Sequence, residues 1–194
     1  MYLKAPADSE AASRLYTKDL EEQGFVMNLS RLWAWRPEVC EGFQRLRDLL
    51  TGSSSLSHRE LGVIVCATAA NLGDSYCALA WGKRLAKAAG ADTAAAVLTA
   101  SQSENLSKRE NALAAWARKV VAGPNETTAD DVEALRISGF TEQEIFEATT
   151  FIAFRIAFST VNDALGAKPD SQLAAAAPPE VRNAVAFGRP IDGQ

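Results

Sequence analysis

The stretch LSHRELGVIVCATAANLGDSYCALAWGKRL, residues 56 to 85, decides the fold because it contains two helix starts and the turn between them. Ser57 stands three residues before Glu60, a spacing that is typical of a capping box at a helix N-terminus. After the turn at residues 71 to 73, Asp74 is well placed to accept a backbone amide as the N-cap of a second helix. The stretch therefore predicts two consecutive helices, over residues 58–70 and 75–89.

The same start signal recurs along the chain, where a hydroxyl residue stands three residues before an acid at the head of an apolar run. The further starts are Ser107 with Glu110, Thr128 with Asp131, and Thr141 with Glu144. Glycines at 52, 90, 123 and 139 fall where the apolar periodicity ends. With no hairpin signal, these patterns predict an all-α protein.

We expect a single domain over residues 1–194, because a chain of this length buries a sizeable core as one unit. The core motif occupies residues 56–90, and the Ala/Pro/Gly-rich segment 170–194 is expected to pack as an extended arm. The predicted helices are a short one near the N-terminus, a segment at 28–35, and helices at 37–50, 58–70, 75–89, 93–101, 108–122, 129–138 and 142–165.

The composition excludes several classes of function. The net charge is -4 and no run of basic residues is present, which argues against nucleic acid as a partner. No stretch approaches the roughly 18 consecutive apolar residues of a membrane helix, and no secretory signal is found, so no membrane partner and a cytoplasmic location are expected. Three cysteines and one histidine show no metal-ligand spacing. We therefore expect no metal, no cofactor and no disulfide framework.

Three parts of the core motif together resemble the alkylhydroperoxidase D / carboxymuconolactone decarboxylase family, in particular its peroxidase-related enzymes. These parts are the LSHRE start, the following VIVCATAAN, and DSYCALAW at the next helix start. Further likenesses are GFVMNLSRLWAWRPEVCEGF at 24–43, NDALG at 162–166 and FGRP at 187–190. The resemblance implies an alkylhydroperoxidase D-like helical domain and an antioxidant, thiol-dependent peroxidase (oxidoreductase) activity.

The site residues of the family are only partly present. The family's peroxidases carry Cys-x-x-Cys at this helix start, with a histidine four residues after the second cysteine and a glutamate twelve residues before the first. The second cysteine falls on Cys77. The first cysteine position holds Asp74, the histidine position holds Trp81, and the glutamate position holds Gly62. The dithiol relay of the family is therefore absent.

The candidate catalytic residues are Cys77, Asp74 and Glu60. A cysteine in the first turn of a helix is favoured as a thiolate by the helix dipole, whereas a nearby carboxylate opposes a second negative charge. Glu60 lies two residues from the family's glutamate position, but its spacing from Ser57 predicts a capping role. The single histidine, His58, is expected at the exposed first turn of its helix, away from the cysteine.

The candidate substrate-binding residues are Trp81, Tyr76 and Arg155. Trp81 follows Cys77 by four residues, so its indole is expected either to cover the sulfur or to pack in the core. On the helix 142–165, Arg155 shares a narrow polar stripe with Glu144, Ser159 and Asn162, and we expect this stripe to face solvent or another subunit. The alternative is an arginine that lines a pocket and binds a carboxylate substrate.

Three functions remain open: a hydroperoxide reductase using Cys77 alone, a non-redox enzyme of the carboxymuconolactone decarboxylase kind, and a non-catalytic ligand-binding protein. The expected partners are a small-molecule hydroperoxide or carboxylate ligand, an external thiol reductant and further copies of the chain, because apolar alanine-rich helices favour a homo-oligomer. Cys66 lies too far from Cys77 for a disulfide along a continuous helix, and after a chain reversal both are expected as small buried residues.

Overall fold

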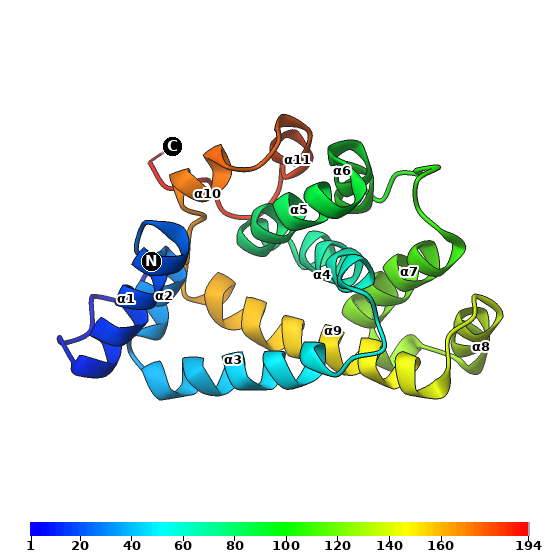
Figure 1. Cartoon of the computed structure of the whole chain (residues 1–194), viewed down its shortest axis with the longest axis horizontal. Coiled ribbons are helices and arrows are strands. Elements are labelled where there is room, and N and C mark those ends of the chain that lie inside the picture. The colour runs from blue at the N-terminus through cyan, green and yellow to red at the C-terminus, as the bar shows by residue number, and fades with distance from the viewer. Residues whose placement is uncertain (194) are drawn as a thin grey trace.

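The computed structural model describes residues 1–193, and these form eleven α-helices and one short 3-10 helix with no β-strand (Figure 1). This confirms the all-α prediction. The helices are α1 (Glu10–Gln23), α2 (Asn28–Trp33), α3 (Pro37–Gly52), α4 (His58–Leu72), α5 (Ser75–Ala89), α6 (Ala91–Thr99), α7 (Lys108–Ala122), η1 (Pro124–Glu126), α8 (Ala129–Ile137), α9 (Glu142–Ala164), α10 (Ser171–Ala175) and α11 (Pro179–Ala184). Within these residues, no helix is long and apolar enough to cross a membrane.

The predicted helix starts are confirmed at the level of individual hydrogen bonds. Capping boxes are present at Ser57, Ser107, Thr128 and Thr141, where the hydroxyl accepts the amide three residues on and the acid there accepts the amide of the cap. Each box satisfies amides that a helix start otherwise leaves without partners. The bounds of α5 and α7 are the predicted ones, since local capping chemistry sets them.

The core is built around α4, which contacts α5, α6, α7 and α9. Residues 63 to 67 of α4 are completely buried, as expected for a helix surrounded by others. The long helix α9 crosses the molecule next to α4, and α3 runs along it on the outer side (Figure 1). Trp33 and Cys40 pack with Phe43 and Phe158 in a second, smaller cluster between α2, α3 and α9.

Two matching helix starts hold α4 and α7 together. Leu-Ser-x-Arg-Glu occurs at residues 56–60 and again at 106–110. Arg59 of the first pairs with Glu110 of the second, and Arg109 pairs with Glu60 at 3.0 Å. Each glutamate therefore closes its own capping box and binds the arginine of the other helix, so the repeat has a structural role.

The C-terminal segment is not the extended arm that its composition predicted. Part of it forms two short helices, α10 and α11, while residues 185–193 are without helix, and α11 packs on α5 and α6. Pro179 occupies the first turn of α11, where the missing amide costs no hydrogen bond. Val181 is fully buried against Gly82 of α5, and this tertiary contact favours a helix that local sequence signals did not indicate.

Candidate active site

A two-residue turn brings Cys77 to the start of α5. Gly73 ends α4 in the left-handed conformation, with φ of 76°, which glycine adopts without strain. Asp74 then accepts the amide of Cys77 on its Oδ1 atom at 2.8 Å and is completely buried. The predicted N-cap role of Asp74 is confirmed, and Cys77 lies in the first turn of the helix.

The side chain of Cys77 meets α9 across the helix interface. Arg155 donates from Nη2 to Cys77 Sγ over 2.8 Å, and Ser159, one turn further along α9, is 3.8 Å from the same sulfur through its hydroxyl. Arg155 is only 5% exposed. The prediction that this stripe of α9 faces solvent or another subunit is therefore wrong, and the alternative of a pocket-lining arginine describes the structure.

The Arg155 guanidinium is buried without a carboxylate. It forms no ion pair within residues 1–193, and its Nε has no hydrogen-bond partner among the protein atoms. Its Cζ atom instead lies 5.7 Å from the ring centre of Trp81 and 5.3 Å from that of Phe158. A buried charge without a counter-ion is costly, so this arrangement is typical of a functional site.

Burial raises the pKa of the Cys77 thiol far above its ordinary value, and the Asp74 carboxylate adds to that rise. Arg155 acts in the opposite direction, because its positive charge stabilises a thiolate. The predicted opposition of Asp74 to a thiolate at Cys77 is thus present, and burial is the largest cause of the raised pKa. Burial and the Asp74 carboxylate therefore both favour the protonated thiol over the thiolate.

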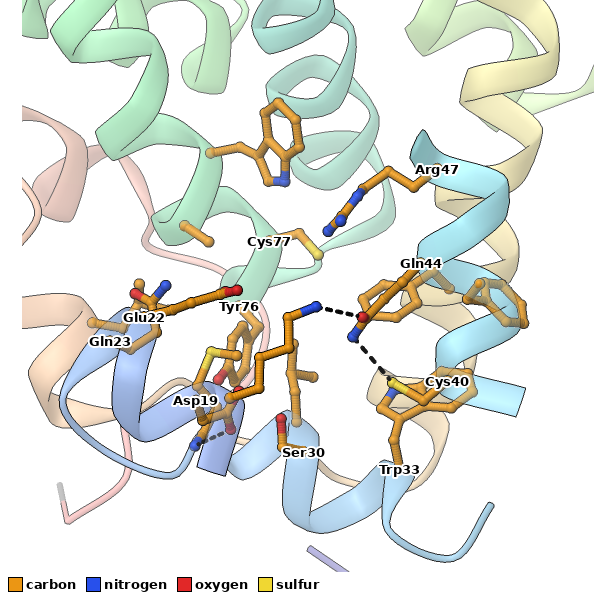
Figure 2. Close-up of a pocket in the computed structure, with 18 of the residues that line it drawn as sticks. Asp19, Glu22, Gln23, Ser30, Trp33, Cys40, Gln44, Arg47, Tyr76 and Cys77 are labelled. Carbon is orange, nitrogen blue, oxygen red and sulfur yellow. Dashed lines mark hydrogen bonds between the residues drawn. The ribbon is translucent and has the colours of Figure 1, made fainter. Parts of the chain in front are cut away.

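Cys77 and Arg155 line a cavity of about 340 Å³ between α1, α2, α3, α5 and α9 (Figure 2). A volume of this size suits a small organic ligand. The aromatic residues of the wall are Trp33, Phe43, Tyr76, Trp81, Phe154 and Phe158. The cavity therefore combines a thiol, a guanidinium and flat apolar surfaces.

The predicted binding residues Trp81 and Tyr76 both line this cavity. Trp81 is partly buried and lies edge-on to Phe151, with ring centres 6.5 Å apart. The Tyr76 hydroxyl donates to Asp170, whose second oxygen accepts the amide of Asn28 at 2.9 Å. Tyr76 consequently offers a ligand its ring, while its hydroxyl ties α5 to the segment after α9.

The structure does not bring Glu60 to the cavity. Its carboxylate is used by the capping box at Ser57 and by Arg109. Gly62 lies against Leu85, whose Cδ1 would be 3.3 Å from an added Cβ, so no acid could replace it without moving the core. His58 is exposed, as predicted. Neither an acid nor an imidazole of α4 therefore serves Cys77.

All three cysteines are free thiols, and they occupy different surroundings. Cys66 is completely buried within α4 and does not line the cavity. Cys40 of α3 does line it, and Figure 2 shows Gln44 linking the Cys40 sulfur, at 3.8 Å, to Lys18, at 2.9 Å. Burial raises the pKa of Cys40 to about 11.

The sequence patterns did not predict the residues that α1 and α3 contribute to the wall of the cavity. Asp19 of α1 is only 4% exposed, accepts the Met27 amide at 2.9 Å, and has a pKa raised by burial. Arg47 points from α3 into the cavity on the side where Cys77 lies (Figure 2). These residues are distant from the core motif in sequence and belong to no motif, so only the folded arrangement reveals them.

No protein-family model matches the sequence, and no curated protein matches it. Solved structures do match. An uncharacterized peroxidase-related protein from Ralstonia eutropha JMP134, with an alkylhydroperoxidase AhpD core, has a TM-score of 0.78 at 24% identity, covering 89% of this chain and 93% of that one. An uncharacterized peroxidase-related protein from Silicibacter sp. TM1040 has a TM-score of 0.78 at 22% identity, with the same coverage.

The debrominase Bmp8 is also similar in structure. A variant in which one of its cysteines is replaced by alanine, in complex with 2,3,4-tribromopyrrole, has a TM-score of 0.73 at 15% identity, covering 90% of this chain and 95% of that one. At these identities the likeness concerns the fold alone. The chain therefore has an all-helical AhpD-like fold, which it shares with uncharacterized peroxidase-related proteins and a debrominase.

Proposed function

We propose that this protein is a thiol-dependent reductase of small organic hydroperoxides, with Cys77 as the nucleophile and Arg155 as its electrostatic partner. The observation that carries the proposal is the 2.8 Å contact between Arg155 Nη2 and Cys77 Sγ in the wall of a ligand-sized cavity. A guanidinium stays protonated in proteins, so it stabilises a thiolate without transferring a proton. In the family's peroxidases a histidine stands where this chain has Trp81. Arg155 supplies a positive charge next to Cys77, as a protonated histidine would, but it does not transfer protons.

The chemistry needs one cysteine and two external thiols. Cys77 first releases its proton to solvent, and the thiolate then attacks the terminal oxygen of the hydroperoxide. The O–O bond breaks, and the alkoxide takes a proton from solvent and leaves as an alcohol. Cys77 becomes a sulfenic acid, oxidised by two electrons while the peroxide is reduced by two. One external thiol condenses with the sulfenic acid and releases water, and a second restores Cys77 and departs in a disulfide.

The test is hydroperoxide consumption in the presence of a small thiol, followed for three variants. Cys77→Ser should abolish the protein-dependent rate, whereas Cys66→Ala, which changes a buried thiol outside the cavity, should retain it. Arg155→Met keeps the length of the side chain but removes its charge. Its rate at neutral pH should fall by about 10- to 100-fold, because losing the guanidinium raises the pKa of Cys77 and so lowers the thiolate fraction. Turnover that persists in Cys77→Ser would contradict the proposal.

A second candidate function is ligand binding without turnover, and the raised pKa of Cys77 favours it. A thiol that stays protonated at neutral pH reacts slowly, because the thiolate is the nucleophile. If the wild-type protein consumes no hydroperoxide while small molecules still bind in the cavity, this second function replaces the first.

A further inference from the structure

The wall of the cavity has a charge opposite to that of the whole chain. Although the net charge of the protein is -4, the wall carries five basic residues and only two acidic ones. The basic residues are Lys18, Arg47, Lys83, Arg84 and Arg155, and the acidic ones are Asp19 and Glu22. Burial raises the pKa of Asp19, which reduces the negative charge in the wall further. The cavity is therefore a positive region on an acidic protein.

Arg84 is the basic residue of this wall that is best placed to meet a ligand. It is an exposed residue, and it forms no ion pair within residues 1–193. Its Cζ atom lies 4.8 Å from the ring centre of Trp81, so the indole face holds the guanidinium beside the cavity. Arg155, by contrast, is already engaged with the Cys77 sulfur.

The basic side chains also act on one another. Although Arg84 is exposed as a whole residue, desolvation of its guanidinium by the surrounding protein lowers its pKa, and the positive charges of Arg47 and Arg155 lower it further. The Glu22 carboxylate of the wall opposes this lowering only as the smallest of the causes, and Arg47 pairs with Asp48 at an exposed position. An anionic ligand would relieve this repulsion, and its carboxylate would match the planar donors of a guanidinium.

We propose that the cavity selects an aromatic or similarly flat ligand that carries a carboxylate, with Arg84 as the specificity-determining anchor of the anion. The ring lies among the aromatic residues of the cavity wall, and the carboxylate meets Arg84, assisted by Arg47. This inference rests on the proposed function in one respect, because it names the substrate of the same cavity: a hydroperoxide of an aromatic acid. Arg155 then remains hydrogen-bonded to the Cys77 sulfur and does not bind the carboxylate of the ligand.

The test uses redox-inert probes, so that it is independent of turnover. Binding of 4-isopropylbenzoate and of the neutral 4-isopropylbenzamide is measured by calorimetry at low salt on the wild-type protein and on three variants. The wild type should bind the acid about tenfold more tightly than the amide, a ratio in the range of a charged hydrogen bond. Arg84→Gln should lose this preference and leave the amide unaffected. Arg84→Lys should keep most of it.

The matched control is Lys87→Gln, which removes an exposed positive charge from the same helix outside the cavity and should change neither affinity. Equal binding of the two probes to the wild type, or a preference that survives Arg84→Gln, would overturn the inference. Hydroperoxide turnover separates the two proposals. If the protein prefers the acid but consumes no hydroperoxide, the carboxylate site stands and the reductase function is rejected. If it consumes hydroperoxide without preferring the acid, the reductase function stands and the carboxylate site is rejected.

Discussion

At the scale of single residues, Cys77 is subject to two opposing charges. Arg155 stabilises its thiolate through a direct contact, while Asp74 destabilises it from the preceding turn. Asp74 is bound to its position, because its Oδ1 caps the helix that carries Cys77. Its Oδ2 has no hydrogen-bond partner among the protein atoms. The same carboxylate therefore builds the site and lowers its reactivity, and the two effects can be separated by a substitution.

Asp74→Asn keeps an oxygen for the cap and removes the charge. The pKa of Cys77 should fall, so the thiolate fraction at neutral pH should rise, and sulfenic acid should form several times faster. The direction of the pKa shift of Cys77 also determines how the reaction rate depends on pH. Because the pKa of Cys77 is raised, the wild-type rate should keep increasing between about pH 7 and about pH 9, whereas the variant should approach its maximum at lower pH.

A trapping reagent for sulfenic acid gives the rate for both proteins. Introducing histidine at position 81 provides a comparison, and we expect a smaller gain from it, because Gly62 offers no carboxylate to orient the new imidazole. If Asp74→Asn reacts at the wild-type rate or more slowly, the carboxylate does not limit Cys77, and the binding function gains support.

At the scale of the helices, α5 depends on a close approach by α11. Gly82 stands in the middle of α5, and an added Cβ there would be 2.6 Å from Cγ1 of Val181 and 3.2 Å from Cδ1 of Leu98. Val181 is completely buried and has little room to move. The glycine therefore allows the C-terminal segment to cover the helix that carries Cys77.

Gly82→Ala should consequently destabilise the protein by about 1 to 2 kcal/mol, since the steric cost exceeds the gain in helix propensity. Gly42→Ala is the matched control. It lies within α3, where the nearest atom to an added Cβ is 3.9 Å away, and it should stabilise the protein by about 0.5 to 1 kcal/mol. Urea unfolding of the two variants measures both changes. A Gly82→Ala variant as stable as the control would show that α11 moves aside easily.

The helices also show which features can be predicted from the sequence. Capping boxes and glycine stops act over three or four residues, so they predicted the bounds of α4, α5, α7 and α9 closely. The N-cap role of Asp74 was predictable for the same reason. The contact between Arg155 and Cys77 joins residues 78 positions apart, and no local pattern encodes it. The α11 helix was missed because its stability comes from packing on α5 and α6.

At the scale of the whole molecule, one edge carries large apolar side chains in contact with solvent. Leu49 of α3 is 72% exposed and Phe146 of α9 is 71% exposed. The end of α3 lies near the start of α9, because Ser54 bonds Glu147 at 2.9 Å. Both helices run along the same edge of the molecule in Figure 1. Leu46 and Ile137 are also exposed. Large exposed apolar side chains on neighbouring helices are a feature of protein interfaces.

We therefore expect a homo-oligomer in which this edge of one copy packs on a second copy. Light scattering at about 10 µM protein should give at least twice the mass of the chain, as is common for soluble oligomers with two-fold symmetry. The double variant Leu49→Ser with Phe146→Ser should shift the population toward monomer, because it removes the apolar surface that association would bury. Leu20→Ser, on the exposed side of α1, is the control and should leave the mass unchanged. A monomeric wild-type protein would refute the prediction, and an oligomer that survives the double variant would place the interface on another face.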